Sequence, residues 1–227
     1  MRTRIFILLS LLLCGPARAV ESMTAPDSIE ARVQGCSTCH GPHGEGNTDP
    51  FFPRIAGKPA GYLFNQLRNF RDGRRSYPPM NYLLAYLHDD YLAEIADYFS
   101  AQTVREQTGI APVMTVAGPG ERLAKQGDAT RAIPACILCH GKLLTGMQPG
   151  IPGLIGLNSR YIAAQLVSWR VGTRHAENPD CMHEIASHLT EAQIGEISTW
   201  LAGQPPSTVA PAAAGSWKTP VACGSEP

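Results

Sequence analysis

Two copies of the string Cys-x-x-Cys-His, at residues 36–40 and 136–140, stand 100 residues apart in this chain. In such a string two thiols separated by two residues can reach both vinyl groups of one porphyrin, and the adjacent imidazole can ligate its iron. A chain with two strings must build a core around each porphyrin. The strings therefore predict two small haem-centred domains rather than one large core.

The two halves match well beyond these strings, with an offset that stays near 100 residues. Such a match at one fixed offset is the signature of a duplicated domain. The matched pairs are residues 52–57 with 151–156, Tyr62 with Tyr161, Gln66 with Gln165, Leu67 with Leu166, Phe70 with Trp169, Arg71 with Arg170, Gly73 with Gly172, and Met80 with Met182.

Apolar residues recur at helical spacing in both halves, and no run of alternating residues indicates strands. We expect helices near 28–35, 61–72 and 89–101 in the first half, and near 121–127, 159–171 and 190–202 in the second. Thr190 with Gln193 is a capping-box start. The predicted fold class is all-α, with two tandem cytochrome c-like domains, each a small helical bundle around a covalently bound haem.

Residues 1–19 are typical of a secretory signal peptide, with basic residues at 2 and 4, an apolar stretch at 5–13 and a small-x-small cleavage site ending at Ala19. Cleavage removes three arginines and leaves 16 basic against 19 acidic residues, a formal charge of −3. This charge argues against a nucleic-acid partner, which requires a concentrated basic face. The segment is too short to span a bilayer, so we expect a periplasmic protein with no integral membrane segment after cleavage.

The predicted organisation is a signal peptide at 1–19, domain 1 at 20–103, a linker at 104–118, domain 2 at 119–203 and a tail at 204–227. The linker mixes Gly, Pro, Thr and Val without helical period. The tail is rich in Pro, Ala and Ser, and we expect it to run as an extended strap over the surface.

Covalent attachment of two haem c groups is assigned to Cys36, Cys39, Cys136 and Cys139, with His40 and His140 as proximal iron ligands. A zinc site would need a second ligand pair of matching spacing in each copy, and none is evident. Pro53 and Pro152 follow the strings, where a backbone carbonyl commonly accepts the proton of the proximal imidazole.

Met80 and Met182 are the candidates for the sixth ligand of each iron, because they occupy the same place in the repeat. A thioether ligand favours Fe(II) and raises the reduction potential. Around Met182, alternative ligands are Cys181, His175, His183 and His188, and Met147 is a further methionine in this half.

Cys181 and Cys223 are the two cysteines left in the mature chain. In an oxidising compartment we expect them to form a disulfide that ties the tail to the Met182 loop. Free thiols, or Cys181 as an axial ligand, are the alternatives. Three further pairs have two interpretations each. The tyrosine pair 62/161 and the aromatic pair 70/169 either pack on the porphyrins or belong to the helix core. The arginine pair 71/170 either binds the propionates or lies on a solvated helix face.

Over residues 28–203 the chain resembles the dihaem cytochrome c4 family, whose members are exported proteins with two class I cytochrome c domains. The resemblance lies in the doubled Cys-x-x-Cys-His, the Gly-Pro-His-Gly-Glu-Gly-Asn run at 41–47, the two Pro-containing segments at 52–57 and 151–156, the Tyr-x-x-x-Gln-Leu helices and the two late methionines. It implies His/Met ligation of both haems and electron transfer toward a terminal oxidase or another respiratory acceptor. The pair Cys181/Cys223, the long tail and a shorter second haem loop depart from the family and suggest a specialised branch, such as an acceptor for one dehydrogenase.

The leading functional hypothesis is a periplasmic electron carrier rather than an enzyme, which passes single electrons between a dehydrogenase donor and a respiratory acceptor. One alternative is a cytochrome subunit bound within a dehydrogenase complex. The other is a dihaem enzyme such as a thiosulfate dehydrogenase, in which one iron has a Cys ligand or an open site. Cys181 is the feature that invites this last alternative.

Overall fold

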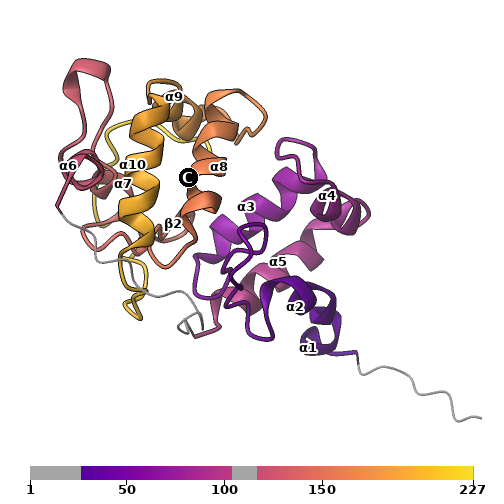
Figure 1. Ribbon diagram of the computed structural model, residues 1–227. Coiled ribbons are helices and arrows are strands. Elements are labelled where there is room, and N and C mark those ends of the chain that lie inside the picture. Colours follow the sequence, from indigo (N-terminus) through magenta and orange to yellow (C-terminus); the bar gives the residue numbers. More distant parts are fainter. Residues whose placement is uncertain (1–26, 104–116, 227) are drawn as a thin grey trace, which may run out of the picture.

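The computed structural model describes residues 27–103 and 117–226. The predicted signal peptide and most of the predicted linker lie outside these residues. Helices dominate both halves, which lie side by side, the first in indigo to magenta and the second in rose, orange and yellow (Figure 1). The first half contains α1 (Ile29–Arg32), α2 (Gln34–His40), α3 (Ala60–Arg71), α4 (Pro78–Leu84) and α5 (Asp89–Ser100).

The second half repeats this order with additions around the haem string. Its elements are α6 (Pro119–Gln126), the 3-10 turn η1 (Ala129–Arg131), α7 (Ile137–His140), β1 (Gly146–Met147), β2 (Ile151–Pro152), α8 (Ser159–Arg170), α9 (Cys181–Ser187) and α10 (Glu191–Ala202). The short antiparallel pair β1–β2 was not predicted. The predicted all-α class, with two tandem helical halves, is confirmed.

Local sequence explains where the long helices begin and end. Asn158 caps α8 by accepting a hydrogen bond from the Arg160 N–H, and Thr190 with Gln193 forms the predicted capping box of α10. Soon after α3 and α8 end, Gly73 and Gly172 adopt φ of 76° and 71°, a conformation that glycine reaches without strain. The expected helices at 61–72, 89–101, 159–171 and 190–202 are confirmed to within one residue at each end.

Both methionine segments, which we expected to be loops, contain a helix of seven residues. Met80 lies in α4 and Met182 lies in α9. Pro78 and Pro79 stand in the first turn of α4, where the missing N–H is not needed for a helical hydrogen bond. Asp180 caps α9 by accepting from the His183 N–H at 3.1 Å. The prolines therefore position these helices rather than prevent them.

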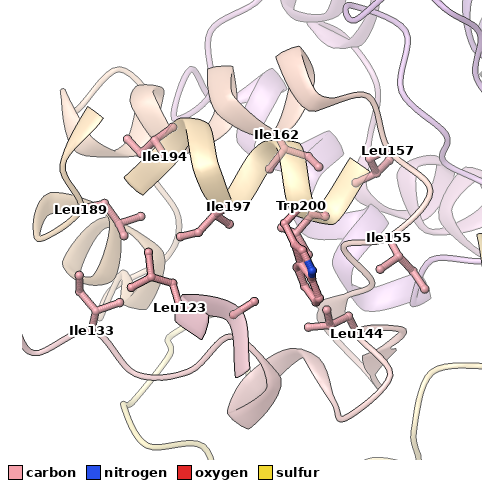
Figure 2. Packing of buried hydrophobic residues seen from close by; sticks show 12 residues of the cluster. Leu123, Ile133, Leu144, Ile155, Leu157, Ile162, Leu189, Ile194, Ile197 and Trp200 are labelled. Carbon is pink, nitrogen blue, oxygen red and sulfur yellow. The ribbon is translucent and has the colours of Figure 1, made fainter. Parts of the chain in front are cut away.

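Domain 2 has one continuous apolar core, and domain 1 has two smaller clusters. Figure 2 shows side chains of the domain 2 core converging from several elements, with the Trp200 indole directed toward Leu144. Helices α6 and α10 cross closely at Gly120, where an added Cβ would lie 2.2 Å from the Glu196 carbonyl oxygen. Only glycine fits at this crossing.

The two domains meet through paired polar side chains. Arg75 and Arg174, equivalent in the repeat, form an isolated antiparallel bridge between their backbones. Each guanidinium donates to both Gln66 and Gln165, at distances from 2.6 to 3.0 Å. This reciprocal arrangement gives the interface an approximate twofold character.

The tail from 204 to 226 contains no helix and follows the surface of domain 2, as expected of an extended strap. Ala212 exchanges backbone hydrogen bonds with β1 and Gln148 at 3.0 and 2.8 Å. A disulfide joins Cys223 to Cys181 at the start of α9. Across the described ranges, the search for a helix of sufficient length and hydropathy to cross a membrane found none.

Candidate haem sites

The two histidines of the strings have equivalent, buried environments. His40 Nδ1 lies 2.8 Å from the Pro53 carbonyl oxygen, and His140 Nδ1 lies 2.7 Å from that of Pro152. Because a carbonyl oxygen can only accept, Nδ1 carries the proton in both rings and Nε2 keeps its lone pair. Burial lowers the pKa of His40, and it lowers the pKa of His140 to about 4. Both imidazoles are therefore neutral and oriented as metal ligands.

The four cysteines of the strings are unpaired and stand beside these histidines. Burial raises the pKa of Cys136 to about 11 and also raises the pKa of Cys36 and Cys139. Cys36, Cys136 and Cys139 are thus protonated thiols, the form from which a thioether is built. Within residues 27–103 and 117–226, no three or more His, Cys, Asp or Glu side chains converge as a metal site.

Domain 2 contains a largely apolar cavity whose empty space, open mouth included, is about 1440 Å³. Cys136, Cys139 and His140 line it, and so does Met182 from α9. Both thiols of the string, its histidine and Met182 therefore face one apolar space. Its apolar lining includes Leu123, Leu157, Ile162, Leu166, Trp169, Ile185, Leu189, Ile197 and Leu201.

The alternative ligands near Met182 lie outside the cavity lining or are already bonded. His183 does not line the cavity, and the sulfur of Cys181, which does, is held in the disulfide. His175 and His188 are not part of the cavity lining, and Met147 lies in β1. Met182 is the methionine that lines the cavity together with His140.

In domain 1, the haem string and the methionine pack against the same apolar side chains. Cys36 and Met80 belong to different apolar clusters, but both clusters include Phe64, Leu67 and Leu87. The string in α2 and the methionine in α4 therefore flank one shared set of apolar residues. This repeats the relation seen between α7 and α9 in domain 2.

Four cations are buried around the domain interface without an acidic partner: Arg54, Lys58, Arg75 and Arg174. Lys58 Nζ donates to the Gly153 carbonyl at 2.9 Å, and Arg54 donates to that of Ile155 at 3.0 Å. No ion pair joins any of the four to a carboxylate in the described chain. Burial lowers the pKa of Arg174 and Arg54 to about 10, and lowers that of Lys58 well below its usual range.

Buried cations are costly unless an anion is near, and Lys58 and Arg174 line the cavity of domain 2. The porphyrin carries two carboxylates of the required charge, so the residues present fit the haem. Arg71 and Arg170, considered from the sequence, lie elsewhere. Arg71 pairs with Asp72 and Asp89 at 2.9 and 2.6 Å, and Arg170 donates only to the Leu189 carbonyl.

The arginines that sequence reasoning missed, Arg75 and Arg174, each stand two residues after a matched glycine of the repeat. Their equivalent positions in the repeat could have identified both arginines as candidates from the sequence. The aromatic assignments also differ between the domains, because Tyr161 and Trp169 line the cavity whereas Phe70 belongs to the apolar core around Met80.

Comparisons with known proteins give consistent relatives, although no family model matches the chain. A thiosulfate dehydrogenase electron acceptor from Thiomonas intermedia is 38% identical over 179 residues, covering 79% of this chain and 82% of that protein. Cytochrome c4 from Pseudomonas aeruginosa is 36% identical over 199 residues, covering 87% of this chain and 96% of that protein. The crystal structure of reduced cytochrome c4 from Pseudomonas stutzeri aligns with a TM-score of 0.68 at 31% identity, covering 77% of this chain and 95% of that chain.

Proposed function

Because this chain belongs to the dihaem cytochrome c4 family and so carries two covalently bound haem c groups, we propose that it is a periplasmic carrier that accepts single electrons from a thiosulfate dehydrogenase. The name of the 38% identical relative supports this choice of donor. Export by the segment at 1–19, cleaved near Ala19, supports the location. The acceptor is a terminal oxidase or another respiratory protein.

The observation that carries the proposal is the placement of His140 and Met182 in one cavity. A site with both axial ligands supplied by the protein has no open position for a substrate, which suits electron transfer rather than catalysis. When bound, the haems supply the one-electron chemistry, and the chain supplies the ligands, burial and charge around them.

Residue by residue, Cys36 and Cys39 attach the first haem, and Cys136 and Cys139 attach the second. The proximal ligands are His40 and His140, oriented by the carbonyls of their matched prolines. The sixth ligands are Met80 and Met182, on α4 and α9.

The buried cations favour electron gain as well as propionate binding. Arg75 and Arg174 stand where the two domains meet and share the same two glutamine acceptors. A buried positive charge stabilises the reduced, less positive state of a nearby haem. The positive charge of this arginine pair therefore favours reduction of the haem in each half of the molecule.

The domain limits proposed are 20–103 and 119–203, joined by 104–118 and followed by the tail at 204–227. A dihaem enzyme with Cys181 as an iron ligand is less well supported, because the sulfur of Cys181 is bonded to Cys223. A cytochrome subunit bound stably to the dehydrogenase would use the same residues and differ only in whether the two proteins separate.

The test mixes the oxidised protein with thiosulfate and a catalytic amount of thiosulfate dehydrogenase, and follows reduction of both haems in the visible spectrum. We expect complete reduction with the dehydrogenase and none with thiosulfate alone. Reduction by thiosulfate alone would identify an enzyme. Failure of the dehydrogenase to reduce the protein, with ascorbate still reducing both haems, would leave a carrier with a different donor. Co-purification from native extracts separates a bound subunit from a free carrier.

A further inference from the structure

The end of the tail forms part of the wall of the domain 2 cavity. Cys223, Ser225 and Glu226 line it together with the string and Met182. The first domain has no counterpart of this tail in the repeat. Any effect of Cys223, Ser225 and Glu226 on a haem is therefore an effect on the second haem.

Several contacts fix the tail end in this position. The disulfide holds Cys223 to Cys181, and the Gly224 N–H donates to the Pro179 carbonyl at 2.8 Å. At Gly224 an added Cβ would lie 2.1 Å from the Asn178 carbonyl oxygen, so the chain passes as close as glycine allows. Asn65 of α3 donates to the Ser225 carbonyl at 3.2 Å, which ties the tail to domain 1.

The carboxyl of Glu226 is half-buried against the Gly150 backbone, where an added Cβ would lie 2.3 Å from Oε1. Oε1 itself is covered and has no hydrogen-bond partner. Burial raises the pKa of Glu226, and the adjacent Gly150 backbone opposes the shift in part. The carboxyl is therefore easier to protonate than one in water.

Charged and titratable groups line both the cavity and a smaller hollow next to it. The cavity includes Lys58 from the segment before α3, Tyr62 from α3, Tyr161 from α8, and Arg174 from the loop after α8. A smaller hollow beside Ser225 includes Arg68, Arg74 and Glu177. Within the described residues, no ion pair joins Glu226 to any of these cations.

We propose that Glu226 is a proton-binding site coupled to the oxidation state of the second haem. The inference rests on the proposed function, because it requires a haem in this cavity. When the iron gains one electron from the donor, Fe(III) becomes Fe(II) and one positive charge is lost. The Glu226 carboxylate then takes one proton from solvent, and on oxidation it returns that proton to solvent.

The expected size follows from Coulomb's law. Two unit charges about 10 Å apart at an effective dielectric constant of about 20 change each other's affinity by roughly tenfold. For a one-electron couple a tenfold change in proton affinity corresponds to about 59 mV. The second reduction potential should fall as pH rises above the usual carboxyl pKa of about 4.3, by up to about this amount.

The experiment measures both reduction potentials of the purified dihaem protein by optical titration between pH 4 and 8. Met182→His, which lowers one potential, identifies the wave of the second haem. We expect Glu226→Gln to remove the acidic pH dependence of this wave and to leave the first wave unchanged. Glu177→Gln is the matched control, because it removes the same charge beside Ser225 but outside the cavity.

Two results would overturn the inference. One is a pH dependence of the second wave that persists in Glu226→Gln. The other is an equal loss in Glu177→Gln, which would reveal a general surface effect. Both leave the proposed function intact if two Met-ligated low-spin signals are present. A preparation with one haem or none would instead contradict the proposed function itself.

Discussion

At the scale of single residues, the sites depend on hydrogen bonds that keep each ligand in one state. The Pro53 and Pro152 carbonyls hold the rings of His40 and His140 so that only Nε2 can ligate. His183 could compete with Met182, but it does not line the cavity. Ligand choice in domain 2 is therefore set by which side chains reach the cavity.

Replacement of Met182 by His tests this assignment. An imidazole ligand stabilises Fe(III), so Met182→His should lower the potential of the second haem and halve the sulfur-to-iron charge-transfer absorption. Optical titration measures both quantities. Met147→Leu is the control, because Met147 is buried in β1 and does not line the cavity. Loss of the band in Met147→Leu, with Met182→His unchanged, would contradict the assignment.

Much of the candidate site was predictable from single residues, for identifiable reasons. Cys36, Cys39 and His40 follow from a local spacing that covalent chemistry requires, and Met80 follows from its equivalence with Met182. Glu226 was not predictable, because its position depends on a tail fixed by contacts with residues far away in sequence.

At the scale of elements, close helix contacts depend on glycine. Helix α6 crosses α10 at Gly120, whereas Gly35 in α2 has no atom within 4 Å of an added Cβ. The sequence predicted the long helices from their apolar period but missed α4 and α9. Their prolines are typical of loops, and only the position of those prolines in or before the first turn makes a helix compatible.

The contrast between the two glycines predicts opposite effects of the same substitution. Gly120→Ala should destabilise the protein by about 1–3 kcal/mol, because the methyl overlaps the Glu196 carbonyl. Gly35→Ala should be neutral or stabilise by about 0.5–1 kcal/mol through helix propensity. Urea unfolding followed by circular dichroism measures both. Equal effects would mean that the helix crossing is looser than described.

The disulfide makes the tail an element of domain 2. It closes a loop with a sequence separation of 42, and removing it should cost about 3–4 kcal/mol. We expect the double variant Cys181→Ser with Cys223→Ser to unfold at lower urea, and reduction of the wild-type protein to give the same midpoint. An unchanged midpoint in both would show that the tail contacts alone suffice.

At the scale of the whole molecule, the two domains are joined by buried cations. Arg174 stacks on Trp169 with its guanidinium 3.6 Å from the ring centroid, and it donates to glutamines of both domains. Neither domain alone completes this arrangement. Sequence reasoning missed it because an arginine of one repeat finds its acceptors in the other.

Arg174→Met should therefore loosen the interface. It leaves Gln66 and Gln165 with fewer donors, at an expected cost of about 1–3 kcal/mol. Calorimetry should show one unfolding transition becoming two as the domains uncouple. Arg170→Met is the control, since Arg170 makes a single long hydrogen bond within domain 2. A single transition in both variants would place the coupling elsewhere.

The bond between Cys181 and Cys223 also has a consequence for how the protein matures. Thioether formation at four cysteines requires a reductant that keeps them as thiols, whereas the remaining two must meet an oxidant. One polypeptide thus needs opposite redox treatments at different sulfurs. A host that supplies only the reductant will yield coloured protein whose carboxyl end is not held by the disulfide. The cell that makes this protein must keep reduction and oxidation apart in time, or must recognise each pair of cysteines separately.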